Sequence, residues 1–208
     1  MDFNNNGNGQ QINITDNQGN VVINMGSKDG IAFKISYPEN LIPRRDMLDK
    51  LNNVFESHSC VLISGIGGMG KTSLAYLYAK GKQFKNVAKV IVNGRIEDAY
   101  WNQMAIPLFN NEDERESFMQ NPNNQKKNEI VKHILSKIDG NNLLILDINT
   151  NNEEIKQEIE TELYNYLPAG DWKTLVLTRT HPENDSVFAR IEMDKMTDIR
   201  GITKHRPS

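Results

Sequence analysis

Residues 65–72 read GIGGMGKT, which fills the pattern G-x-x-x-x-G-K-[ST]. Just before this segment lies a short apolar run, residues 60–63, whose β-branched members suit a buried parallel strand. Just after it, residues 73–79 carry apolar side chains at helical spacing. A strand, a glycine-rich loop and a helix in this order predict a phosphate-binding loop, or P-loop.

The residue types of this loop match the chemistry of phosphate binding. Glycines let the backbone adopt positive φ and approach phosphates closely, and the N–H groups of the loop and first helical turn form an anion site. Lys71 is expected to reach the β- and γ-phosphates, and the Thr72 hydroxyl to ligate Mg²⁺. The alternative is a glycine-rich turn that matches by chance, which the flanking strand and helix disfavour. The residues expected to bind nucleotide here are Gly65, Gly67, Gly68, Met69, Gly70, Lys71, Thr72 and Ser73.

Length and charge narrow the class of protein. A chain of 208 residues is long enough for one α/β domain with an appendage. A net charge of -3 gives no reason to expect nucleic acid as the main partner, and no apolar run approaches the length of a membrane helix. The polar N-terminus does not read as a secretory signal, and the single cysteine, Cys60, suits a reducing cytoplasm. We therefore expect a cytoplasmic protein without a membrane partner.

The chain divides by composition into three parts. Residues 1–30 are rich in Asn and Gly, with alternating stretches at 11–15 and 21–25 around an Asn/Gly turn, which predicts a small β-hairpin. Two strands alone are marginal in water, so this segment is docked, paired with another chain through an open edge, or disordered. Residues 31–200 are expected to form the nucleotide-binding domain, and residues 201–208 a polar tail.

Strands and helices alternate through the larger part. Further strands are expected at 87–92, 143–147, 173–180 and 188–193, and helices at 44–58, 126–138 and 153–167, whereas residues 95–125 give no clear pattern. This alternation predicts an α/β fold: the three-layer P-loop nucleoside-triphosphatase fold, with a parallel sheet of about five strands plus the N-terminal β-hairpin.

The strand at 143–147 supplies a candidate metal ligand. Four apolar residues end in Asp147, the arrangement in which P-loop enzymes hold Mg²⁺. The alternative role of Asp147 is a turn or cap at a strand end. Isoleucine follows at position 148, and Asn149 would be a poor base, while Glu153 and Glu154 suit an exposed first helical turn. Any hydrolysis is therefore expected to be slow.

Arg179 is the third candidate for the chemistry. The strand that ends near it should lie beside the strand before the P-loop, and residues at the carboxyl ends of such strands face the ligand. Arg179 is expected to sense a γ-phosphate; its alternative role is an exposed strand-end arginine. The catalytic candidates are therefore Lys71, Asp147 and Arg179, and the metal ligands Thr72 and Asp147.

With these segments assembled, the chain resembles the nucleotide-binding domain of the STAND class of signalling ATPases, the NB-ARC and NACHT-like group. Four segments carry the resemblance: the P-loop at 65–72, LIPRRDML at 41–48, LLILD at 143–147 and the strand at 173–180. In that family the segment at 41–48 contacts adenine, which implies contacts from Ile42 and Arg44 here. The resemblance implies ATP or ADP with Mg²⁺, and no Asn-Lys-x-Asp segment reads guanine.

The chain departs from the family pattern in three places. Pro43 stands where a glycine is usual, and Ile148 where many relatives have a second acid. Relatives continue into a helical lid and a winged-helix domain, so we expect either a piece of a longer protein or a chain completed by others, with weaker nucleotide retention. The resemblance implies a nucleotide-dependent switch used in signalling or defence, associating with itself or with partner proteins. An AAA-like turnover ATPase or a non-catalytic nucleotide-binding scaffold are the alternatives, so whether this chain is an enzyme stays open.

Overall fold

The computed structural model describes residues 9–16, 19–26, 31–109, 112–136, 138–150, 152–180 and 188–193. They form a parallel sheet in the order β5-β6-β7-β4-β8 and an antiparallel sheet in the order β1-β2-β3. The strands are β1 (Gly9–Asp16), β2 (Gly19–Gly26), β3 (Ile31–Ile35), β4 (Cys60–Ser64), β5 (Asn86–Val92), β6 (Asn142–Ile148), β7 (Trp172–Thr178) and β8 (Ala189–Glu192). The helices are α1 (Arg45–Val54), α2 (Lys71–Lys82), α3 (Ile96–Leu108), α4 (Glu112–Gln120), α5 (Asn124–Ser136), α6 (Glu153–Thr161) and the 3-10 turn η1 (Leu163–Tyr166).

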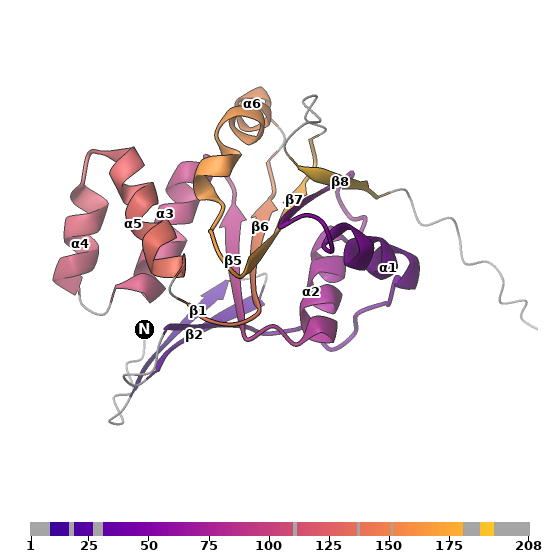
Figure 1. Ribbon diagram of the computed structural model, residues 1–208, viewed down its shortest axis with the longest axis horizontal. Helices are drawn as coiled ribbons and strands as arrows, with labels where there is room; N and C mark the ends of the chain where they lie inside the picture. Colours follow the sequence, from indigo (N-terminus) through magenta and orange to yellow (C-terminus); the bar gives the residue numbers. More distant parts are fainter. Residues whose placement is uncertain are drawn as a thin grey trace, which may run out of the picture.

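The parallel sheet is the middle of three layers. Alternate residues of its strands enter two separate cores because successive side chains of a strand point to opposite faces. Leu143 and Ile145 of β6 pack toward α1 and α2, whereas Leu144 and Leu146 pack toward α3, α5 and α6. The helices flank the sheet on its two sides in Figure 1. The predicted P-loop fold, with a parallel sheet of five strands and an N-terminal β-hairpin, is confirmed.

The antiparallel sheet sits at the amino ends of the parallel strands. β1 and β2 form the predicted hairpin, and β3 adds a third strand that the sequence reading did not anticipate. Phe33 of β3 is buried edge-on against Trp172, the first residue of β7, with ring centroids 5.8 Å apart. The Phe33 backbone N–H donates to the Asn86 side chain at 3.2 Å, and Asn86 donates in turn to Asn142 at 2.7 Å. This sheet is therefore docked on the α/β domain through β3, at the bottom of Figure 1.

Several predicted boundaries differ from the structure, and the helix expected at 44–58 ends at Val54. The helix expected at 153–167 ends at Thr161 and is followed by the 3-10 turn η1, which buries Leu163 and Tyr166. Residues 95–125, which gave no clear pattern, form α3 and α4, and these helices bury Trp101, Met104 and Phe118. The predicted tail at 201–208 lies outside the described residues.

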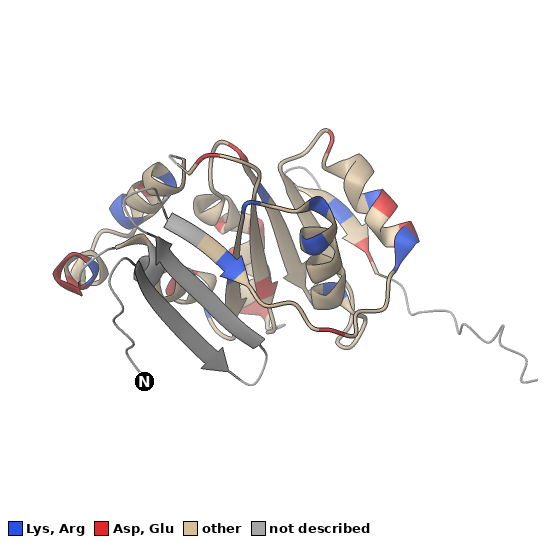
Figure 2. Ribbon diagram, turned by 90° about the horizontal axis from the view of Figure 1, so that it is seen from below, with Lys and Arg blue, Asp and Glu red and all other residues tan. Residues whose placement is uncertain are grey.

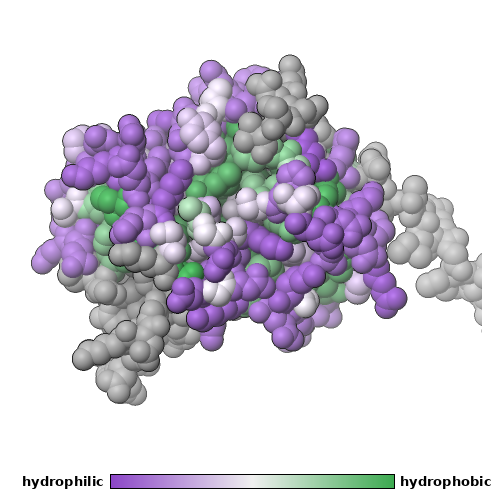
Figure 3. All heavy atoms as spheres, viewed as in Figure 1, coloured by the Kyte–Doolittle hydropathy of each residue, from purple (hydrophilic) through white to green (hydrophobic). Residues whose placement is uncertain are grey.

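The visible surface of the molecule is mostly hydrophilic. Hydrophilic residues cover most of the face in Figure 3, and hydrophobic surface gathers mainly over its middle. Along the described ribbon of Figure 2, Lys and Arg are interspersed with Asp and Glu. Among the described residues, no helix is both long and apolar enough to cross a membrane.

Candidate functional site

The P-loop connects the carboxyl end of β4 to the first turn of α2. Gly68 and Gly70 have φ of 81° and 84°, a region that L side chains rarely adopt, and Gly70 is the N-cap of α2. A Cβ at Gly65, where φ is 152°, would lie 3.0 Å from the Met193 carbonyl oxygen at the end of β8. The glycine pattern is therefore required by backbone conformation and by close packing. The loop opens at a helix N-terminus, where backbone N–H groups favour an anion.

Lys71 is the first residue of α2 and its side chain folds back over the loop. Its Nζ donates to the carbonyl oxygens of Gly65 at 2.5 Å and Ile66 at 3.1 Å. Burial lowers the pKa of Lys71, the Arg179 guanidinium lowers it further, and the Asp147 carboxylate acts in the opposite direction. The ammonium is thus held at the loop, within the field of both predicted catalytic partners.

Thr72 and Asp147 meet across the site, although 75 residues separate them in the sequence. The Thr72 hydroxyl donates to Asp147 Oδ2 at 3.1 Å, and Asp147 is buried at the end of β6. A hydroxyl and a carboxylate on one spot are hard oxygen ligands of the kind Mg²⁺ takes, with phosphates and waters supplying the remainder. In the described part of the chain, no three His, Cys, Asp or Glu side chains gather as a metal site. The donor set here fits Mg²⁺ held together with a phosphate.

Arg179 lies directly after β7, beside the P-loop, and is exposed. β7 pairs with β4 in parallel, so the prediction that these two strands are neighbours is confirmed. A Cβ at Gly67 would lie 3.6 Å from the Arg179 Cζ, so the guanidinium rests against the loop. The buried hydroxyls of Thr178 and Thr180 hydrogen-bond each other at 2.8 Å and brace this strand end.

A pocket of about 280 Å³ joins these residues. Its described lining consists of Gly67, Gly68, Met69, Gly70, Lys71, Thr72, Ser73, Asp147, Ile148, Asn149 and Arg179. Asp147 is the only carboxylate among these lining residues. Glu153 and Glu154 are exposed in the first turn of α6, as the sequence predicts. Asn149 makes its own contact, donating to the Asn93 side chain at 3.4 Å.

Ile42 and Arg44 lie outside this lining. Ile42 is 65% exposed. Arg44 forms an ion pair with Asp46 at 3.7 Å, and its Nη1 is buried without a hydrogen-bond partner in the described part of the chain. The adenine contact implied for this segment stays a prediction.

The sequence reading missed Lys89 and Tyr76. Lys89 is buried in β5, and its Nζ lies 3.4 Å from Asp147 Oδ2 and 2.9 Å from the Tyr76 hydroxyl of α2. One signal was available, because Lys89 is the single charged residue within the apolar run of residues 87–92. A lysine in a buried strand requires a partner, although the sequence does not name it.

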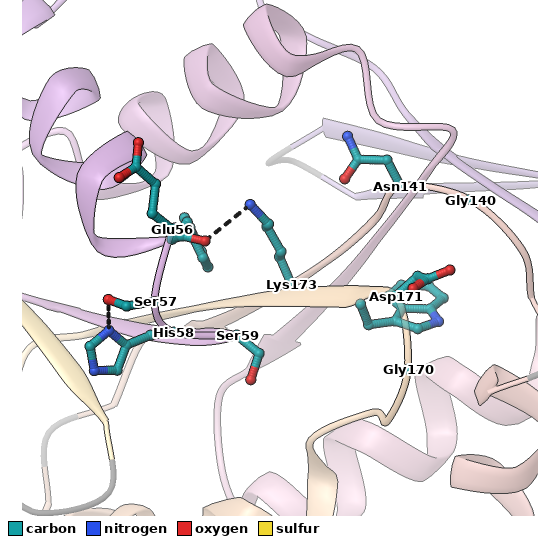
Figure 4. A pocket seen from close by; sticks show the side chains of 11 residues that line it. Glu56, Ser57, His58, Ser59, Gly140, Asn141, Gly170, Asp171 and Lys173 are labelled. Atoms are coloured by element: carbon teal, nitrogen blue, oxygen red, sulfur yellow. Dashed lines mark hydrogen bonds between the residues drawn. The ribbon is translucent and has the colours of Figure 1, made fainter.

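A larger hollow, of about 580 Å³, lies at the opposite end of the sheet. Figure 4 shows its lining, which comes from the turns before β4, β6 and β7. Lys173 points from β7 to the Phe55 carbonyl oxygen, at 3.4 Å, and lies over the Phe55 ring. Ser57 and His58 pair with each other at 2.9 Å. These side chains satisfy one another instead of converging on a shared point, so size alone does not make this hollow a site.

Comparisons with known proteins find similar folds among solved structures. No protein-family description matches the chain, and no curated protein matches it. Among solved structures, it is similar to a Signal Transduction ATPase with Numerous Domains (STAND) protein with a tetratricopeptide repeat sensor from Pyrococcus horikoshii. The identity is 22% and the TM-score 0.51, over 76% of this chain and 24% of that protein. This chain thus spans about a quarter of that STAND protein.

Two more distant likenesses concern other ATPases. The Walker-type ATPase of Pyrococcus abyssi is 12% identical with a TM-score of 0.40, over 76% of this chain and 55% of that one. The RuvB Holliday junction branch migration motor of Thermotoga maritima is 20% identical with a TM-score of 0.36, over 76% and 48%. At these identities a likeness concerns the fold alone. The fold, shared with the STAND protein, is that of P-loop ATPases.

Proposed function

We propose that this chain is an ATP- and ADP-binding signalling switch of the STAND type. The observation that supports it most is one pocket in which Lys71, Arg179 and the Thr72–Asp147 pair converge on a loop of backbone N–H groups. Two cations and a helix N-terminus attract a polyanion, and the hydroxyl–carboxylate pair suits the Mg²⁺ that accompanies a triphosphate. Lys71 would exchange its bonds to the loop carbonyls for bonds to the β- and γ-phosphates.

Hydrolysis is slow in this proposal. An attacking water needs a group that orients it and accepts its proton. Asp147 is committed to the metal, Ile148 has no polar atoms, and the Asn149 amide is not a base. With no second carboxylate in the described lining, the ATP state persists, as a switch requires. When bound, Mg²⁺ would neutralise charge on the phosphates; Thr72 and Asp147 are the residues that would hold it.

Nucleotide retention is expected to be weak. The pocket, at about 280 Å³, lies just below the roughly 300–1,000 Å³ range of ligand sites, which suits the phosphates better than a whole nucleotide. The preference for ATP over GTP, and the adenine contacts of Ile42 and Arg44, rest on the resemblance to STAND proteins. The signalling and defence roles and the cytoplasmic location rest on the same resemblance and on the cysteine content.

The switch would act through association with itself or with a partner protein. β1 is the outer strand of the N-terminal sheet, and an outer strand offers backbone N–H and C=O groups to an added strand. The sheet contacts the amino ends of the parallel strands, away from the P-loop at their carboxyl ends. An added strand would therefore leave the pocket open.

The first experiment identifies the nucleotide. Purified protein is denatured by heat, and any released nucleotide is identified by chromatography, with Lys71→Ala as the variant and Lys80→Ala, an exposed lysine of the same helix, as the control. ADP or ATP released from wild type and the control, but not from Lys71→Ala, supports the proposal. If nothing is released and added ATP with Mg²⁺ does not bind either, nucleotide binding is rejected for this chain.

A second measurement separates a switch from a turnover enzyme and from a scaffold. Sedimentation velocity in ATP and in ADP reports the association state, and phosphate release reports turnover. Association that differs between the two nucleotides, with slow turnover, supports the switch. Fast turnover points to an ordinary ATPase, and binding without either effect points to a scaffold.

A further inference from the structure

Lys89 places a positive charge behind the predicted metal ligand. It lies on the face of β5 that is turned toward α2, and its side chain is 4% exposed. Ile91, two residues further along β5, is the register partner of Asp147, and Lys89 is the partner of Ile145. Lys89 and Asp147 therefore lie diagonally across two adjacent strands on one face of the sheet.

Three contacts hold the ammonium. Nζ lies 2.9 Å from the Tyr76 hydroxyl, 5.2 Å from the centre of the Tyr76 ring and 3.4 Å from Asp147 Oδ2. Oδ2 is also the oxygen that accepts from Thr72. A buried ammonium is stable only with partners of this kind, and a buried carboxylate likewise needs a cation. Each charge thus compensates the other before any metal arrives.

We propose that Lys89 is a positioning residue that acts as a fixed internal cation for Asp147. It holds the carboxylate in place with or without Mg²⁺, and its charge weakens the attraction of the carboxylate for the metal. Mg²⁺ then adds little to the stability of the protein alone. This inference rests on the proposed function only where it concerns the nucleotide; the pairing of Lys89 with Asp147 is tested without one.

The test follows Mg²⁺ rescue in the full chain. Thermal unfolding is measured without nucleotide, in EDTA and in Mg²⁺, for wild type, Lys89→Met, Lys89→Arg and Lys80→Met, with NaCl matched to the ionic strength. In EDTA, Lys89→Met is expected to unfold roughly 5 °C lower than wild type because it removes the ammonium that forms an ion pair with the buried Asp147 carboxylate. Mg²⁺, but not NaCl, restores most of this loss, whereas wild type, Lys89→Arg and Lys80→Met respond little.

Asp147 supplies the internal control. In the double variant with Lys89→Met and Asp147→Asn, the rescue by Mg²⁺ disappears because its ligand is gone. Should Lys89→Met aggregate, Lys89→Gln, which keeps a neutral donor, carries the same expectations. If Mg²⁺ shifts wild type and both Lys89 variants equally, Lys89 has only a structural role and the proposal is overturned.

A second readout uses the nucleotide. The ratio of the ATP dissociation constant in EDTA to that in Mg²⁺ measures how strongly metal and nucleotide binding are coupled, and it should rise about tenfold in Lys89→Met. An unchanged ratio contradicts the inference. If wild type binds no ATP in either buffer, the proposed function fails, while Mg²⁺ rescue of unfolding still decides the role of Lys89.

Discussion

At the scale of single residues, charge decides what the P-loop can hold. Lys71, Arg179 and Lys89 bring three positive charges close to Asp147, the one carboxylate in the described lining of the pocket. A phosphate chain with its metal is the kind of ligand that balances such a set. Lys71 and Arg179 occupy different parts of the site, because the buried Lys71 bonds the Gly65 carbonyl oxygen and the exposed Arg179 lies against Gly67.

Arg179→Ala should therefore weaken ATP more than ADP. A hydrogen bond to a charged group contributes about 1.5–3 kcal/mol, so we expect a loss of ATP affinity of roughly 10- to 100-fold with a smaller effect on ADP. Calorimetric titration with both nucleotides measures this difference. Arg115→Ala serves as the control, since Arg115 pairs with Glu112 on α4. An equal loss for ATP and ADP would mean that Arg179 does not distinguish the γ-phosphate.

The thiol of Cys60 should resist alkylation in the folded protein. Burial raises its pKa from 9.0 to about 12. At pH 8 the folded thiolate fraction is then roughly 100- to 1,000-fold below that of a free thiol, and reagent access is also blocked. Because the unfolded thiol loses its proton first, this group lowers the free energy of unfolding as the pH rises from about 9 toward 12. Labelling by iodoacetamide with and without urea checks the protection; fast labelling of folded protein would contradict it.

At the scale of elements, distant contacts decide where helices begin. The first N–H groups of α3 donate to a side chain of α6, with Ile96 N 3.1 Å from Glu158 Oε2 and Glu97 N 3.2 Å from Glu158 Oε1. On the same face of the sheet, the Tyr100 ring of α3 and the Tyr166 ring of η1 have centroids 5.4 Å apart. The start of α3 is therefore fixed by a residue about 60 positions away, and a local pattern does not reveal it.

Glu158→Ala should destabilise the fold at this junction. It leaves two buried N–H groups without acceptors and removes a negative charge from a helix N-terminus, which costs about 2–3 kcal/mol. Urea denaturation followed by circular dichroism measures the loss. Glu154→Ala, an exposed position in the same helix, should change little, and Glu158→Gln should fall between the two. A loss in Glu158→Ala no larger than in Glu154→Ala would refute this capping role.

At the scale of the whole molecule, the candidate nucleotide pocket and the N-terminal sheet lie at opposite ends of the parallel sheet. The candidate nucleotide pocket lies at the carboxyl ends of the parallel strands, and the N-terminal sheet contacts their amino ends (Figure 1). Between them lie the two cores, one on each face of the sheet. Stability and ligand binding can therefore be disturbed separately.

Phe33→Ala should test this separation. Truncating a buried phenylalanine costs about 3–5 kcal/mol, so the free energy of unfolding should fall by about that amount. ATP affinity should stay close to that of wild type, because Phe33 contacts Trp172 at the far end of the sheet. Denaturant titration and nucleotide titration of the same preparation measure both. A parallel fall in ATP affinity, at a temperature where the variant is folded, would show that the two ends are coupled.

Local signals were sufficient for the parallel sheet and for the centre of the site. Apolar runs in the sequence were enough to predict the strands β4 to β7, and the glycine pattern was enough to predict the P-loop. Lys71, Thr72, Asp147 and Arg179 follow from those assignments, since parallel strands bring their carboxyl ends together. Tertiary contacts decided the remainder. The start of α3 depends on its hydrogen bonds to Glu158, and the burial of Lys89 depends on its partners in α2 and β6. The third strand of the N-terminal sheet depends on the packing of Phe33 against Trp172.

Phe33 also fixes the register of the strands in the antiparallel sheet. Ile12 is paired with Ile23, and Ile23 with Phe33, across the three strands. A slip of β3 by one residue would turn Phe33 away from Trp172 and bring Lys34 into its place, because side chains alternate along a strand. Strands rich in Asn and Gly specify their own pairing poorly. The contact of Phe33 with β7 therefore fixes the register of the whole antiparallel sheet. It also determines which backbone N–H and C=O groups β1 presents at its outer edge.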